Sequence, residues 1–344
     1  MNETWRACGG GVGACGAGGR AVRVRGADVG VCVRVVRAGV RGADVGVCVR
    51  VVRAAGRNTV VGMPLNEMIL DNPKAERVRR MRELTQTKGR RKHGRFLAEG
   101  PQAVREAVRF APGAVRDLVV ALDDGSTMGR RNAILESEAL DAGIYVHHAD
   151  AKVVTHVSPD CQGILAVVDA SAVGADASQL PSGGMVAAFW QVRDPGNAGA
   201  VIRAADAAGC SAVVFVDDCV DALSPKVVRS TAGSLFHLPV AHMGEDEFFD
   251  WVHRTGRGAV AADVYGTQAR PVVDLPDAVA SPDARAWLSG AGFAVLFGNE
   301  ARGLEPGTVD RCDMAVRIPI YGKAESLNLA TSAAVMLYSF AMSR

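Results

Sequence analysis

The stretch DPGNAGAVIR, residues 194–203, follows a strand-like apolar run and leads into a helical pattern. Two comparable stretches lie further along the chain, LFGNEARGL at 296–304 and IPIYGKAESLNLA at 318–330. Each places glycine and a few polar side chains directly after an apolar run. Open α/β sheets form their ligand sites at the carboxyl ends of their strands. The three stretches therefore predict one composite site in an α/β domain.

The first stretch predicts a turn at Pro195-Gly196 and a helix N-cap at Asn197. Arg203 follows six residues later among apolar neighbours, where a guanidinium is a poor core residue unless it is paired. A local cap or ion pair is one interpretation of Arg203. A phosphate or substrate contact is the other, because the arginine fork matches phosphate geometry.

The other two stretches carry the remaining candidate residues. Gly298 allows close backbone approach to a ligand, and Glu300 could accept hydrogen bonds from a ligand or hold an arginine. The alternative interpretation of Glu300 is a structural one, in which its carboxylate lies near a helix N-terminus and is stabilised by the helix dipole. Ser326 and Asn328 precede a strongly apolar helical pattern. For Ser326, capping the N-terminus of that helix is the alternative to a role in the site.

The ordered set of three resembles the SpoU (TrmH-like) family of RNA ribose 2′-O-methyltransferases, in the SPOUT class. Residues 197–203 are similar to the family's N-x-G-A-x-x-R motif, 298–300 to its G-x-E turn, and 326–328 to its S-L-N motif. Ala204 is a departure, since many members carry Thr or Ser there. The match covers residues 185–344. Residues 74–170 resemble the L30e-like substrate domain of many members, notably through RFLAEG at 95–100.

The resemblance implies an α/β SPOUT domain with a deep trefoil knot, S-adenosylmethionine bound in the knot, and a homodimer whose site draws on both chains. The implied catalytic residues are Asn197, Arg203, Glu300, Ser326 and Asn328. The implied cofactor contacts are Leu296, Gly298, Ile318, Ile320 and Leu327. Because an arginine stays protonated, we expect Arg203 to acidify the ribose hydroxyl jointly with an RNA phosphate.

The implied function is 2′-O-methylation of a structured RNA that depends on S-adenosylmethionine. Ribosomal RNA is the first candidate substrate, and transfer RNA is the alternative. A non-catalytic RNA-binding or assembly factor is a third interpretation, which the presence of all five candidate catalytic residues disfavours.

Composition and pattern divide the 344 residues into four segments. With 49% hydrophobic and 22% charged residues, the chain is long enough for two globular domains plus extensions. We predict a low-complexity basic head at 1–62, an L30e-like RNA-binding domain at 63–170, a linker rich in small residues at 171–184, and the methyltransferase domain at 185–344. Strand-like and helical runs alternate in both domains, which is typical of α/β folds. The expected strands are 96–100, 118–121, 144–146, 164–168, 185–192, 212–216, 240, 259–264, 293–297 and 314–318, and the expected helices are 73–84, 102–110, 131–142, 197–208 and 326–340.

The head contains the sequence RGADVGVCVRVVRA twice without a change, at 25–38 and 41–54. We predict that residues 1–62 have no ordered fold, or that they precede the true start at Met63 or Met68. A basic arm that binds nucleic acid is one alternative. Aggregation of the two valine-rich copies as strands is another, because V-x-V alternation fits a β pattern.

Residues 74–95 carry ten Lys and Arg against Glu76 and Glu83. Phosphate contacts dominate affinity for nucleic acids, so this patch is the predicted RNA-docking surface. Its predicted contacts lie in a basic turn over 88–95: Arg90, Arg91, Lys92 and Arg95.

Other features limit the class of protein. No apolar run approaches the length of a membrane helix, and no signal peptide is recognisable, so we expect a cytoplasmic protein without membrane contact. The eight cysteines form no C-x-x-C pair and are expected to be free thiols. His147, His148 and His156 lack a credibly spaced third ligand, so we expect surface histidines and no metal site.

Overall fold

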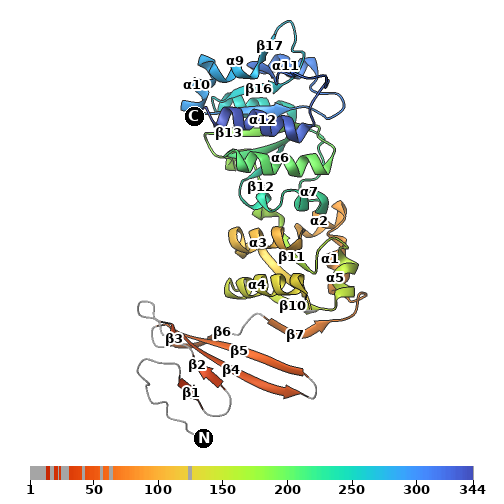
Figure 1. Ribbon diagram of the computed structural model, residues 1–344, viewed down its shortest axis with the longest axis vertical. Helices are drawn as coiled ribbons and strands as arrows, with labels where there is room; N and C mark the ends of the chain where they lie inside the picture. Colours follow the sequence, from red (N-terminus) through yellow and green to blue (C-terminus); the bar gives the residue numbers. More distant parts are fainter. Residues whose placement is uncertain are drawn as a thin grey trace. The chain divides into compact units, whose positions relative to one another are not determined.

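The computed structural model describes residues 13–15, 19–21, 23–24, 31–40, 43–54, 57–61, 65–122 and 126–343. It forms two units, Met1–Leu65 and Asn66–Arg344. The second unit holds both predicted domains (Figure 1). Among the described residues, no helix is long and apolar enough to cross a membrane.

Where the structure describes the head, it consists of strands. These are β1 (Gly13–Cys15), β2 (Gly19–Ala21), β3 (Arg23–Val24), β4 (Val31–Val40), β5 (Ala43–Ala54) and β6 (Arg57–Val61). The two sequence copies pair with each other as the antiparallel strands β4 and β5. Aggregation of these copies as strands stays a prediction. The remaining residues of 1–62 lie outside the described residues. The start site at Met63 or Met68 stays a prediction.

The substrate domain is built on a five-stranded sheet of order β7-β10-β9-β11-β8. Helices α1 and α5 cover one face of this sheet, and α3 and α4 cover the other (Figure 1). Apolar residues of α1 and α5 pack on Leu97, Val119 and Leu165 to form one core. The elements are β7 (Leu65–Leu70), α1 (Glu76–Glu83), α2 (Thr87–His93), β8 (Arg95–Glu99), α3 (Gly100–Phe110), β9 (Val115–Ala121), α4 (Thr127–Asp141), β10 (Val146–Ala149), α5 (Ala151–Val157) and β11 (Ile164–Asp169).

The C-terminal domain is built on an eight-stranded parallel sheet of order β12-β15-β14-β13-β18-β16-β19-β17. Its strands are β12 (Gly174–Ala175), β13 (Met185–Trp190), β14 (Ala212–Val216), β15 (Val240–Met243), β16 (Gly258–Ala262), β17 (Val272–Asp274), β18 (Phe293–Phe297) and β19 (Met314–Arg317). Its helices are α6 (Pro195–Ala207), α7 (Pro225–Ser230), α8 (Glu245–Arg254), α9 (Leu275–Ala280), α10 (Pro282–Ser289), α11 (Pro306–Arg311) and α12 (Leu329–Ala341), with a short 3₁₀ turn η4 at Ser234–Phe236.

Alternating side chains of the central strands face two helical layers. Val186, Ala188 and Trp190 of β13 pack with the aromatic residues of α8. The intervening side chains face α6 and α12, where Phe293 contacts Phe340 edge to face at 4.8 Å between ring centroids. A strand covered on both faces needs an apolar residue at every position, which explains the unbroken run MVAAFW in β13.

The chain leaves β13 toward β14 and β15, then crosses to β16 on the other side of β13, and β18 returns between β13 and β16. Such a reversal of strand order opens a crevice at the carboxyl ends of the two neighbouring strands. The site is therefore expected at the ends of β13 and β18, from which two of the three motifs start.

The structure corrects several predicted boundaries. The predicted linker 171–184 contributes the edge strand β12, because its backbone groups pair with β15. The predicted basic turn 88–95 is mostly the helix α2, which ends at Gly94 in the left-handed conformation (φ 61°). Strand β17 was not predicted.

Candidate functional site

Helix α6 begins at Pro195, directly beyond the end of β13. Its N-cap is Asp194, whose carboxylate accepts the backbone N–H of Asn197 at 2.8 Å. Proline fits the first turn because its missing N–H needs no partner there. The prediction of Asn197 as the N-cap is therefore wrong by three residues. This shift leaves the amide side chain of Asn197 available for other contacts.

The carboxylate of Glu300 connects the turn after β18 to the start of α6. It accepts the backbone N–H groups of Asp194 at 3.1 Å and Arg193 at 3.3 Å, and the Nδ2 of Asn197 at 3.3 Å. Glu300 therefore lies at a helix N-terminus, which was the alternative interpretation of this residue, and its contact with a ligand stays a prediction.

Asn197 in turn contacts the third motif. The Nδ2 of Asn328 donates to the Oδ1 of Asn197 at 3.0 Å. The Oδ1 of Asn328 accepts the N–H groups of Ala330 and Thr331, so Asn328, and not Ser326, is the N-cap of α12. These bonds fix both amide orientations. One hydrogen-bonded chain, Glu300–Asn197–Asn328, joins the three motifs.

The turn after β18 requires glycine for a steric reason. A Cβ on Gly298 would lie 2.4 Å from the carbonyl carbon of Gly303. Asn299 and Gly303 close the turn through two backbone hydrogen bonds of 3.1 and 2.8 Å. The Nδ2 of Asn299 also donates to the carbonyl of Gln191 at 2.7 Å, which attaches this turn to the end of β13.

Sequence reasoning missed Gln191, Asn299 and Asp194 as residues that hold the site together. Asp194 could have been found, because an aspartate directly before Pro-Gly is a typical cap. Gln191 gives no such signal. Its positive φ of 51° and its contact with Arg302 at 2.8 Å arise from tertiary structure.

Gly199 explains the glycine in the first motif. A Cβ there would lie 1.8 Å from the Oγ of Ser230 on α7. Ser230 donates to the carbonyl of Pro195 at 3.0 Å. The close approach of α6 and α7 therefore fixes the first turn of α6, where Asn197 lies.

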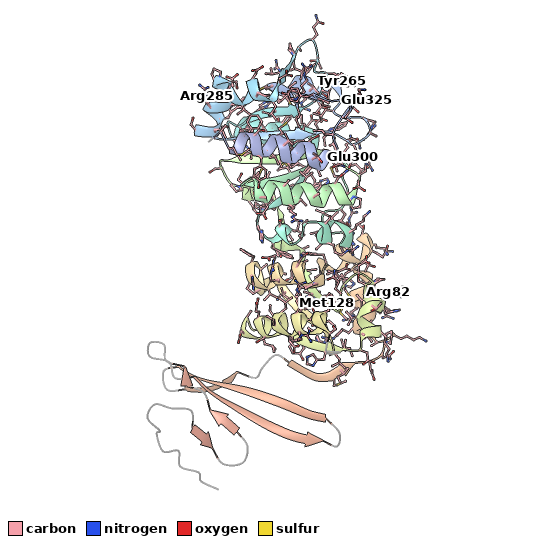
Figure 2. The ribbon with its side chains drawn as sticks, viewed as in Figure 1. Arg82, Met128, Tyr265, Arg285, Glu300 and Glu325 are labelled. Atoms are coloured by element: carbon pink, nitrogen blue, oxygen red, sulfur yellow. The ribbon has the colours of Figure 1, made fainter. Side chains whose placement is uncertain are left out.

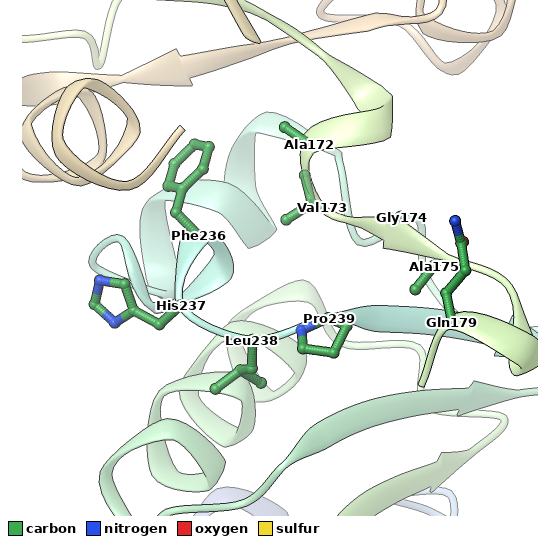
Figure 3. Close-up of a pocket in the computed structure, with 9 residues that line it drawn as sticks. All are labelled: Ala172, Val173, Gly174, Ala175, Gln179, Phe236, His237, Leu238 and Pro239. Carbon is green, nitrogen blue, oxygen red and sulfur yellow. The ribbon is translucent and has the colours of Figure 1, made fainter. Parts of the chain in front are cut away.

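A cavity of about 330 Å³ lies against this network. Its walls come from all three motifs and from the end of β16, and it is lined by Asn197, Ala262, Phe297, Gly298, Asn299, Glu300, Gly303, Ser326, Leu327, Asn328, Leu329 and Ser332. Figure 2 shows Glu300 and Glu325 on the same side of the C-terminal domain.

The predicted cofactor contacts divide into three groups. Gly298 and Leu327 line the cavity. Ile318 is half-buried, and Ile320 is exposed in the loop after β19. Leu296 does not line the cavity, because its side chain is fully buried in the core between the sheet and α8, and its contact with the cofactor stays a prediction. Strand alternation explains this, because Leu296, one residue before the end of β18, points to the opposite face of the sheet from Phe297, which lines the cavity.

Arg203 is not brought to this cavity within the chain. It lies six residues beyond Asn197 on α6, which places it roughly 9 Å along the helix and about 120° around it. Its side chain is exposed and has no hydrogen-bond or ion-pair partner within the part of the chain that the structure describes. The local cap or ion pair that was the alternative interpretation of Arg203 is therefore not found among the residues that the structure describes.

Arg90 is a structural residue, and its prediction as an RNA contact is wrong. Only 5% of its surface is exposed. Its Nη2 and Nε contact the carboxylate of Asp221 at 2.6 and 3.0 Å, and its Nη1 donates to the carbonyls of Leu84 and Thr85. A guanidinium with its donors occupied in this way cannot also bind phosphate. It instead ties α2 to the C-terminal domain.

The other three predicted RNA contacts are exposed. Arg91 and Lys92 lie on the solvent side of α2, and Lys92 contacts only Glu83, at 3.4 Å. Arg95 is half-exposed and pairs with Asp169 at 3.1 Å. Arg116 also pairs with Asp169, and this arginine holds the pKa of the Asp169 carboxyl below its usual range.

The histidines differ from the prediction in one case. His147 is fully buried and contacts Asp117 at 2.9 Å, so it is not a surface residue. His148 pairs with Glu136 at 2.7 Å, and this carboxylate raises the pKa of His148. Within the described ranges, no group of three or more His, Cys, Asp or Glu side chains could hold a metal ion.

Comparison with known proteins agrees with this geometry. The SpoU rRNA Methylase family matches residues 184–338, and the MRM3-like substrate binding domain matches residues 75–166. The 23S rRNA (guanosine(2553)-2′-O)-methyltransferase RlmP of Bacillus subtilis is 31% identical over 274 residues, which are 78% of this chain and 97% of that protein. The chain belongs to the SpoU rRNA methylase family.

Solved structures share the fold over the same region. An AdoMet-bound rRNA methyltransferase from Sinorhizobium meliloti superposes with a TM-score of 0.65 at 27% identity, over 80% of this chain and 97% of that one. The SpoU methyltransferase AviRb from Streptomyces viridochromogenes, in complex with AdoMet, gives 0.62 at 26% identity, over 78% and 98%. The α/β methyltransferase fold and the preceding substrate-binding domain are thereby confirmed.

Proposed function

We propose that this chain methylates a ribose 2′-hydroxyl of ribosomal RNA with S-adenosylmethionine as the methyl donor. The observation that carries the proposal is the Glu300–Asn197–Asn328 network beside a cavity at the ends of β13 and β18. The names of the relatives support ribosomal RNA as the substrate and do not favour the transfer RNA alternative.

The cavity fits the cofactor in size and in lining. Ligand cavities typically measure about 300–1,000 Å³ and combine apolar walls with a few polar groups. Here Phe297, Leu327 and Leu329 are apolar, and Gly298 contributes backbone atoms to the lining. S-adenosylmethionine supplies a methyl group on a positively charged sulfur. We expect Gly298, Ile318, Ile320 and Leu327 to hold it, chiefly through backbone groups.

The polar network positions the reacting groups. Glu300 carries a negative charge next to the cavity and fixes the amide of Asn197, whose orientation Asn328 fixes from the other side. Neutral amides can align a ribose hydroxyl without binding its proton permanently. Ser326, which lines the same cavity, supplies a further hydroxyl donor and acceptor.

Arg203 is the remaining catalytic candidate, and it would act in a homodimer. Its guanidinium is exposed and unpartnered among the described residues, and it lies outside the cavity of its own chain. The outer face of α12 exposes Val335, Tyr338 and Met342. We propose that a second copy covers α6 and α12 and that Arg203 of one copy completes the site of the other. There it would stabilise the developing ribose oxyanion. A trefoil knot over β18, β19 and α12 belongs to the same proposal.

Ribosomal RNA would dock on α2 of the substrate domain. Lys88, Arg91 and Lys92 are exposed there, whereas the body of the protein is acidic outside this patch and the head. Phosphate contacts from such a patch give affinity without sequence readout.

The test is transfer of tritium from labelled S-adenosylmethionine to in vitro transcribed 23S rRNA. We expect Arg203→Ala to lower kcat by about 100-fold, in the range found for loss of one oxyanion donor, while calorimetry finds unchanged cofactor affinity. Arg203→Lys serves as the charge-preserving control. Equal incorporation by wild type and Arg203→Ala would remove the role of Arg203. Failure of the wild type to bind S-adenosylmethionine would favour a non-catalytic RNA-binding factor.

A further inference from the structure

Two tyrosines of the C-terminal domain present almost their whole side chains to solvent. Tyr265 is 89% exposed and Tyr321 is 92% exposed, whereas Tyr145 and Tyr338 are 40% exposed. In the described part of the protein, neither of the two exposed side chains makes a hydrogen bond or an aromatic ring contact. Tyrosine is large and mostly apolar, so such exposure is typical of a contact surface.

Both tyrosines lie at the sheet edge that carries the site. Tyr265 comes three residues after Ala262, the last residue of β16, which itself lines the cavity. Tyr321 comes four residues after Arg317, the last residue of β19. β16 pairs in parallel with both β18 and β19. The two tyrosines therefore follow the carboxyl ends of adjacent strands, beside the Gly298–Glu300 turn, and Figure 2 shows Tyr265 on the same side of the domain as Glu300.

The loop that bears Tyr265 is held in one conformation. Asp263 accepts the N–H groups of Tyr265 at 2.9 Å and Gly266 at 2.6 Å. The N–H of Thr267 donates to the carbonyl of Arg270 at 2.9 Å. Gly266 has a positive φ of 64°, and a Cβ there would lie 2.6 Å from that carbonyl oxygen. A ring presented on a fixed loop loses little entropy when it binds a partner.

The charges around the two rings are balanced. The loops 263–271, 298–304 and 318–328 carry Asp263, Glu300 and Glu325 against Arg270, Arg302 and Lys323. A surface for phosphate groups needs an excess of cations, which this edge lacks. Aromatic faces without net charge instead suit stacking with nucleobases.

We propose that Tyr265 and Tyr321 stack on unpaired bases that flank the target nucleotide of the RNA. This inference rests on the proposed function, because it takes RNA as the occupant of the cavity edge. Sequence-specific RNA recognition uses splayed-out bases stacked on aromatic side chains. Unpaired bases next to the target nucleotide are free to stack in this way. The two tyrosines would therefore hold the strand open on either side of the target ribose.

The test compares Tyr265→Ala, Tyr321→Ala and the double variant with the ring-preserving Tyr265→Phe and Tyr321→Phe. Affinity of the full-length protein for in vitro transcribed 23S rRNA is measured by filter binding at several KCl concentrations. Each alanine variant is expected to bind about tenfold more weakly, because stacking of one base is worth about that much. Each phenylalanine variant is expected to match wild type. The slope of log affinity against log salt should stay constant, since no phosphate contact is lost.

Two controls separate this inference from its alternatives. Calorimetric affinity for S-adenosylmethionine and the mass of the particle in solution should be the same in all variants. A change in either would overturn the proposal in favour of a cofactor contact or an interface between two copies. RNA affinities within twofold of wild type in the double variant would also overturn it. Because binding is read separately from tritium transfer, a wild type that binds RNA without methylating it would refute the proposed function and leave the stacking test valid.

Discussion

Replacing Arg90 by alanine removes a buried cation from the junction between the two domains. The side chain makes five hydrogen bonds, of which two reach Asp221, two reach the carbonyls of Leu84 and Thr85, and one reaches the hydroxyl of Thr87. Breaking a buried ion pair from one side typically costs about 3–5 kcal/mol. Asp221 remains 32% exposed and can be rehydrated, so we expect the lower end, about 3 kcal/mol.

This loss corresponds to a fall in Tm of about 4 °C for a chain of 344 residues, because the entropy of unfolding is about 2.1 cal/mol/K per residue. Urea unfolding and calorimetry would measure it. The matched control is Arg91→Ala, one residue along the same helix, where the side chain is exposed. Exposed substitutions usually change stability by no more than about 0.5 kcal/mol. Arg91→Ala should therefore keep its Tm and lose RNA affinity, with a flatter salt dependence.

The reasoning would be refuted by the opposite pattern. If Arg90→Ala kept the stability of wild type and lost RNA affinity, Arg90 would be the RNA contact predicted from the sequence. A double-mutant cycle with Asp221→Asn adds an independent readout. Strong coupling between the two positions is expected, since they share the ion pair.

Three further outcomes follow from the geometry. Asn328→Asp keeps an N-cap oxygen for α12 but loses the Nδ2 donor to Asn197. We therefore expect kcat for tritium transfer to fall at least tenfold while Tm stays within about 2 °C of wild type. A parallel loss of Tm would show that the cap had failed instead. Burial raises the pKa of Cys312 to about 12 and that of Cys219 to about 11. Mass spectrometry should therefore find both thiols unalkylated by iodoacetamide at pH 8 in the native protein and alkylated in urea. Rapid alkylation of either thiol in the native protein would contradict its burial. Glu136 raises the pKa of His148, so the stabilisation from this pair should be complete below the unfolded pKa near 6.5 and should disappear as pH rises through the higher folded pKa. The measurement is the difference in free energy of unfolding between wild type and His148→Asn at pH 6 and at pH 9. A difference that did not shrink at pH 9 would disprove the link.

The sequence by itself determined the class of fold and most of the site. The unbroken apolar runs predicted the strands β14 and β18 to the residue, because a strand buried on both faces tolerates no polar position. Glycine and polar residues in the stretches after such runs located Asn197, Gly298, Glu300 and Asn328 at one edge of a parallel sheet. These signals are local, so a single sequence carries them.

Tertiary structure alone decided which charged side chains are buried in ion pairs and which are exposed to solvent. Arg90 and Arg91 are adjacent in the sequence and chemically identical, yet one is buried against Asp221, 131 residues away, and the other faces water. The same holds for Leu296, which packs in the core, and Leu327, which lines the cavity. Such differences depend on which distant segments pack on a residue, and no local pattern encodes that.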